Sequence, residues 1–162
     1  MASSTELLGV YLNDHLAGSV AALELIRHSM EQNEGTALGA FLGSLRRDIE
    51  EDSQELEQIM ASLGVERSTL KRATSWLAEK ASRVKFDERL TRSAELSRVL
   101  ELEAMSLGIE GKLSLWKSLK AISGDDPRLA ARDFDRLMAR AREQLDGLEV
   151  HRLEAVTQAF GA

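Results

Sequence analysis

The chain contains no cysteine, a single proline and few aromatic residues. The absence of cysteine excludes disulfide bonds, thiolate metal sites and cysteine nucleophiles. Aromatic residues, which favour strands, make up only 4% of the chain, whereas leucine, alanine, glutamate and arginine are abundant. This composition is typical of an all-α protein.

Long uninterrupted apolar runs are also missing. No stretch approaches the ~20 consecutive apolar residues that a membrane-spanning helix requires, so we expect no membrane span. The first residues, MASSTELLGV, contain neither a basic segment nor a continuous apolar one and do not resemble a signal peptide. From these features the sequence predicts a cytoplasmic protein.

The chain is acidic, with a formal net charge of -6 at pH 7. A negative protein surface repels phosphate backbones, which disfavours nonspecific binding to nucleic acid over the whole surface. We therefore expect no nucleic-acid partner. The length of 162 residues is that of a single domain and suffices for one sizeable core.

Apolar residues recur with the 3.6-residue period of a helix in four long segments. The predicted helices cover about 5–32, 37–63, 94–123 and 127–160, and together they form one domain of residues 1–162. The turn at Asn33–Gly35 separates the first two, Gly64 is a typical residue after a helix end, and Pro127 suits a first helical turn. The matched lengths predict a helical bundle.

The connections between the segments predict how the helices pack. The first two helices, and the last two, are joined by few residues and must be antiparallel neighbours. Gly64 to Arg92 separates the second helix from the third, with an amphipathic pattern of its own over about 68–85. A connection of this length can cross the whole bundle. We therefore predict a ferritin-like up-down-down-up four-helix bundle with an extra crossover helix.

The chain contains the stretches YLNDHLAGS, GAFLGSLRRDIEEDSQEL, WLAEKASRVKF, LELEAMSLGIEGKLSLW and QLDGLEVHRLEA. These resemble uncharacterised bacterial proteins of the ferritin-like superfamily, over nearly the whole chain. The resemblance implies the fold. It implies nothing about chemistry, because those proteins have no established activity.

Di-iron members of that superfamily use a Glu on each of two helices and a Glu-x-x-His pair on the other two. Residues three apart share a helix face, so each pair brings a carboxylate and an imidazole to one metal. This chain has Glu55-x-x-Gln58 and Glu149-x-x-Arg152 in those places, and a guanidinium cannot be a metal ligand. We therefore expect no di-iron centre, no bound metal and no cofactor.

Three ionisable residues occupy seam positions where a packed helix normally carries Leu or Ile: His15, Asp52 and Glu110. Counted from the turns, they lie at similar heights in the bundle. A buried charge must be paired or neutralised. We therefore expect Asp52 to be buried and paired with His15.

Further polar residues belong to this predicted layer. Arg140 or Gln144 of the last helix is expected opposite Glu110, and Glu103 is expected to pair with Arg152. Such a layer can serve only to fix the register of the helices, or it can bind a small ligand or a single metal ion. The structural role is the more common one, since buried polar groups are usually satisfied and seldom catalytic.

Glycine recurs inside the predicted helices, where each one costs about 1 kcal/mol relative to alanine. Gly18, Gly108 and Gly111 fall near the height of the polar layer. Either they let two helices pack closely, or the missing side chains leave a small polar cavity beside the buried charges. The sequence favours close packing, because small residues generally serve it.

The sequence contains no recognisable catalytic motif, and the favoured function is a non-catalytic bundle acting through self-association or a partner protein. The alternative is a protein, an oxidoreductase among the options, that binds a small ligand or metal with His15, Asp52 and Glu110. A dry, fully paired layer would indicate association. A cavity open to solvent would indicate the alternative.

Overall fold

The computed structural model describes residues 1, 3–68 and 93–161. Over these ranges the chain forms helices and no strands: α1 (Ser4–Gln32), α2 (Ala37–Leu63), α4 (Ala94–Ile122), α5 (Pro127–Ala130) and α6 (Phe134–Phe160). The predicted all-α class is confirmed. Residues 69–92, which include nearly all of the predicted crossover helix at about 68–85, lie outside the described residues. None of the described helices is long and apolar enough to cross a membrane.

Short polar side chains determine where the long helices begin. Ser3 accepts a hydrogen bond from the Glu6 N–H while the Glu6 carboxylate accepts one from the Ser3 N–H, which forms a capping box at α1. Thr36 and Ser93 cap α2 and α4 with their hydroxyl oxygens. Gly64 ends α2 with a left-handed φ of 71°. These three helices begin and end within one residue of the predicted ranges.

The fourth predicted helix, 127–160, is not continuous. It is divided into the single turn α5 and the long helix α6. The break has a local cause, because the Asp133 carboxylate accepts a hydrogen bond from the Arg136 N–H at 2.9 Å and so begins a new helix. The change of direction also buries Leu129 completely and leaves Phe134 only 3% exposed. Burial of these two side chains favours the break over one straight helix.

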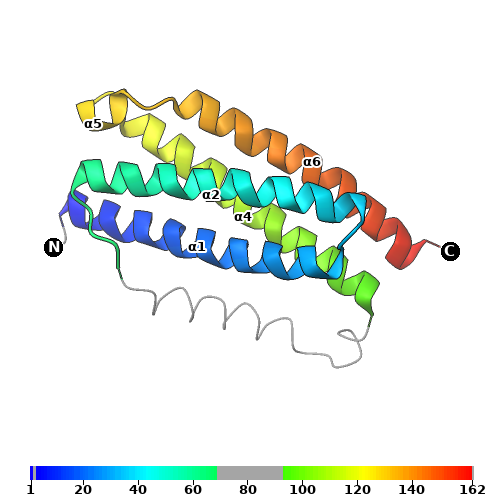
Figure 1. Ribbon diagram of the computed structural model, residues 1–162. Coiled ribbons are helices and arrows are strands. Elements are labelled where there is room, and N and C mark those ends of the chain that lie inside the picture. Colours follow the sequence, from blue (N-terminus) through cyan, green and yellow to red (C-terminus); the bar gives the residue numbers. More distant parts are fainter. Residues whose placement is uncertain (2, 69–92, 162) are drawn as a thin grey trace.

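Contacts at the two ends of the bundle establish the directions of the helices (Figure 1). At one end Arg98, near the start of α4, donates to Asn33 just before α2 and to Gln158 at the end of α6. At the other end Arg128, which follows α4, donates to the carbonyl of Leu63 at the end of α2. Helices α2 and α4 therefore run in the same direction, and α6 runs in the opposite one.

The four long helices form a bundle in which each packs on two others. Helix α1 lies against α2 and α4, and α6 lies against α4 and α2, so α2 and α4 are diagonally opposite (Figure 1). The core follows the predicted steps of three and four along α2, where one acid lies within an apolar seam: Leu38, Leu42, Leu45, Ile49, Asp52, Leu56, Ile59 and Leu63 are all buried. The acid lies at mid-height and faces α4 and α6.

Candidate functional site

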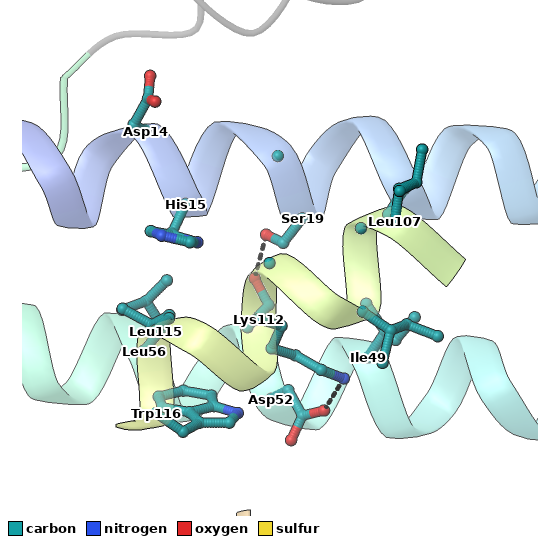
Figure 2. Close-up of a pocket in the computed structure, with 16 residues that line it drawn as sticks. Asp14, His15, Ser19, Ile49, Asp52, Leu56, Leu107, Lys112, Leu115 and Trp116 are labelled. Carbon is teal, nitrogen blue, oxygen red and sulfur yellow. Dashed lines mark hydrogen bonds and ion pairs between the residues drawn. The ribbon is translucent and has the colours of Figure 1, made fainter. Parts of the chain in front are cut away.

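A cavity of about 200 Å³ lies between α1, α2 and α4 at the middle of the bundle (Figure 2). Its walls are largely apolar and include Ile49 and Leu56 of α2 and Leu115 of α4. The cavity opens to solvent past the exposed side chain of Leu107. It is therefore a half-enclosed pocket rather than a sealed void.

Three glycines keep this space open. A Cβ atom built at Gly18, Gly108 or Gly111 meets no neighbouring atom within 4 Å, and all three glycines line the cavity. The close-packing interpretation is therefore wrong for these positions. It fits Gly147 instead, where a Cβ atom would lie 2.7 Å from Cε2 of Phe41.

Asp52 and Lys112 form the polar floor of the cavity, and two residues of α6 bond to them from behind it. The Asp52 side chain is only 2% exposed, as the seam position predicted. Lys112 of α4 donates to Asp52 Oδ2 at 2.5 Å, Arg140 of α6 donates to Oδ1, and Gln144 of α6 donates to Oδ2 at 3.4 Å. Lys112 also donates to Gln144 Oε1. Arg140 or Gln144 was expected opposite Glu110, and the structure places both against Asp52 instead.

The charges in this floor perturb one another. Burial lowers the pKa of Lys112, and the attraction of Asp52 offsets this only in part. Burial also acts to lower the pKa of Arg140, but Asp52 and Glu51 outweigh it and raise that pKa. Arg140 therefore remains a cation, whereas burial destabilises the charged form of Lys112.

His15 is not the partner of Asp52, contrary to the prediction. It lines the cavity from α1 (Figure 2), and its ring packs edge-on against Tyr11 with centroids 4.6 Å apart. The carboxylate oxygens of Asp52 are taken by Lys112, Arg140 and Gln144. Burial lowers the pKa of His15, which Asp14 counteracts only weakly, so the imidazole is neutral at pH 7.

Glu110 does not belong to the buried layer either. Its side chain is exposed, because the face of α4 that enters the core runs through Ile109, Lys112 and Trp116. Lys112 is the residue that sequence reasoning missed. The signal was present, since steps of three and four from Ile109 to Trp116 pass through position 112 and not through position 110.

The second predicted pair exists, but it lies at the surface. Arg152 approaches Glu103 at 3.4 Å and its own helix neighbour Glu149 at 2.6 Å. The Glu103 side chain is 47% exposed. Screening by solvent makes such a pair a minor contributor to the fold.

The residues of this bundle do not fit a di-iron centre. Glu55, in the expected ligand position, pairs with Arg132 at 3.0 Å, and the central layer places Lys112 and Arg140 where carboxylates and imidazoles would be required. Across the described ranges, no group of three or more acidic or histidine side chains is placed to hold a metal ion.

One polar atom of the cavity wall has no partner. The indole Nε1 of Trp116 is buried and donates no hydrogen bond, although its residue is only 1% exposed. Figure 2 shows the nitrogen edge of the ring turned toward Asp52 and Lys112. Because buried donors are nearly always satisfied, this atom marks a place where an acceptor is missing.

A double-mutant cycle tests the assignment of the Asp52 partner. Asp52→Leu should destabilise the protein by about 3–5 kcal/mol, because it leaves the buried Lys112 without its carboxylate. Lys112→Met should cost less, because Asp52 stays paired with Arg140 and Gln144. Combined, they should cost about 1–3 kcal/mol less than the sum, measured by urea unfolding. Asp52→Leu with His15→Leu is the control and should be additive. Coupling in the control and additivity in the first cycle would show that the floor is wrongly assigned.

The pH dependence of stability tests the environment of His15. Its pKa in the folded protein is lowered, whereas in the unfolded chain it is ordinary, near ~6.5. As the pH falls through that value, His15 binds a proton in the unfolded chain more readily than in the folded protein. The free energy of unfolding therefore decreases as the pH falls, and the contribution of His15 to it is complete only above that value. Urea unfolding at pH 8 and pH 5.5 should show a smaller loss for His15→Gln than for wild type. The exposed His28, changed to Gln, should leave the loss unaltered; equal losses in all three proteins would contradict the burial of His15.

Comparisons of the chain with protein-family models, with curated proteins and with solved structures find no match. The likeness to ferritin-like proteins therefore rests on the sequence stretches alone. What the protein does must be inferred from the geometry and chemistry of the cavity, because a fold by itself does not define a function.

Proposed function

We propose that this protein binds a small molecule, non-catalytically, in the cavity between α1, α2 and α4. The observation that carries the proposal is the half-open volume of about 200 Å³ with apolar walls and a charged floor. Ligand sites commonly combine an apolar lining with a few polar groups. A polar layer without a cavity, with all of its groups paired, would have favoured association. The open cavity therefore favours ligand binding over association as the function.

The glycines support this proposal energetically. Gly18, Gly108 and Gly111 each cost about 1 kcal/mol relative to alanine within a helix. No packing contact offsets that cost, since a Cβ atom at any of the three would meet open space. What these residues provide is the volume itself.

The size of the cavity indicates the size of the ligand. An apolar cavity of about 150 Å³ is known to hold benzene. At about 200 Å³ this one can take a ring or a branched chain of similar bulk together with a polar group. Ser19 and Ser53 bond to each other at 3.0 Å rather than to a base, which favours binding over nucleophilic chemistry.

We also propose that the bundle has the ferritin-like arrangement. The support is the direction of the helices: α2 and α4 run the same way on opposite corners, and each long helix lies antiparallel to its neighbours. That arrangement requires a connection from one end of the bundle to the other between α2 and α4. The sequence from Gly64 to Arg92 is long enough to make it.

Self-association is the second candidate function, and one face of α6 favours it. Val150, Leu153 and Phe160 lie at helical spacing on that face and are 56%, 50% and 63% exposed. An apolar stripe of this kind on a two-fold axis can pack against its own copy. It leaves the cavity on the other side of α4 free, so the two functions are compatible.

Benzene is the probe for the cavity. It should raise the unfolding temperature of the wild-type protein, because a ligand that binds only the folded state stabilises it, by about 2.7 kcal/mol at a hundredfold excess over Kd. Gly111→Leu should fold, since its Cβ has no neighbour within 4 Å, and should lose the response because its side chain fills the cavity. Ala104→Leu, exposed on the same helix, is the matched control and should respond as wild type does. An equal response in all three proteins would rule the cavity out as the ligand site, and so would the absence in wild type of any response to benzene and to its polar derivatives.

Sedimentation velocity tests the second candidate. The wild-type protein should sediment as a dimer, and Leu153→Glu should shift it to the monomer, because a charge in the centre of an apolar stripe cannot be paired there. Leu7→Glu, which changes an exposed leucine on α1, should leave the dimer intact. A monomeric wild type, or the same loss from both substitutions, would remove α6 as the interface.

A further inference from the structure

We propose that the ligand of this cavity is a small monocarboxylic acid with an apolar body, whose carboxylate is received by Lys112 and Trp116. The inference rests on the proposed function and specifies the chemical class that the site recognises. It is carried by three features of the cavity floor: its unused hydrogen-bond donors, its charge balance and the spacing of the two donors along α4.

The first feature is a surplus of donors. A lysine ammonium has three N–H groups, and Lys112 uses two of them, toward Asp52 Oδ2 and Gln144 Oε1. Within the described part of the chain, Lys112 makes no third hydrogen bond and Trp116 Nε1 makes none. Asp52 accepts from Lys112, Arg140 and Gln144 but not from the indole. A ligand that brings an acceptor to this floor would satisfy both donors.

The second feature is a surplus of positive charge. Lys112 and Arg140 place two cations in the layer against the single buried carboxylate of Asp52. Glu51 pairs with Arg140 from outside and is itself 65% exposed, so it compensates little of the interior charge. Asp48 of α2, which is half-buried, also attracts Lys112 but forms no hydrogen bond with it. An anion in direct contact with the ammonium would therefore add to the compensation of the two cations. The lowered pKa of Lys112, caused by burial, is consistent with that deficit.

The third feature is geometric. Residues 112 and 116 are one helical turn apart, so their side chains lie on the same face of α4 and can address one group together. A carboxylate has two oxygens on a planar fork, and each oxygen can accept from one of the two donors. The rest of the cavity is walled by Ile49, Leu56 and Leu115, which suit an aromatic ring or a branched alkyl chain.

Benzoate and benzamide make a matched pair of probes, since they share shape and differ in charge. By calorimetry on the full chain, benzoate should bind at least tenfold more tightly than benzamide. Lys112→Met should remove that preference, and it keeps Asp52 paired with Arg140 and Gln144. Lys117→Met, an exposed lysine of the same helix, is the control and should preserve the preference.

The indole N–H of Trp116 gives a direct readout. Its proton resonance should move downfield when benzoate binds, and the Trp76→Phe variant, which leaves Trp116 as the only tryptophan, assigns the signal. Equal affinity for the two probes with an unmoved indole resonance would overturn the carboxylate assignment. So would binding of benzene without binding of benzoate, while the proposed function would stand. If benzene, benzoate and benzamide all fail to bind, both the proposed function and this inference are wrong.

Discussion

The bundle depends on one buried carboxylate. Asp52 lies at mid-height on α2 and accepts hydrogen bonds from α4 and α6, so a single side chain connects three of the four long helices. Removing charges from water is expensive, and the attraction between them offsets that expense only when the geometry is right. A shift of α4 by one turn would place Gly108 or Trp116 opposite Asp52, so that the carboxylate would lose Lys112 and keep only Arg140 as a cation. The apolar seams permit several registers, and this layer penalises all but one of them.

The same layer explains why the cavity lies where it does. Lys112 must reach across the diagonal of the bundle to Asp52 (Figure 2), and a long unbranched side chain fills less width than a packed leucine. Gly18, Gly108 and Gly111 remove further volume on the side of α1. On the side of α6 the space is occupied by Arg140 and Gln144. The open volume is thus confined to one side of the charged layer, with the ammonium at the boundary.

Helices α1, α2 and α4 could be predicted to within one residue, and α6 except for the break at Asp133, because caps and apolar periodicity are local properties that tertiary packing here reinforces. The burial of Asp52 was predictable for the same reason, since its apolar neighbours define the seam. The partners of Asp52 were not. To predict whether Glu110 or Lys112 faces Asp52, the rotation of α4 about its own axis must be known to within half a turn. His15 lies at the height of Asp52, but on the opposite side of the charged layer from the cations that pair with it. Whether a glycine marks a contact or a cavity depends on the distance between helices, which no local pattern encodes.

Lys112 belongs both to the ion pair that fixes the register and to the wall of the cavity, and this double role couples folding to binding. A cation that is short of compensating charge weakens the empty protein, because desolvation of the ammonium is incompletely offset. An anionic ligand at the same atom supplies the missing charge and therefore stabilises the fold through the group that recognises it. Neutral ligands of equal shape fill the volume without that gain. The charge of the ligand, more than its bulk, is then what the interior of this bundle distinguishes.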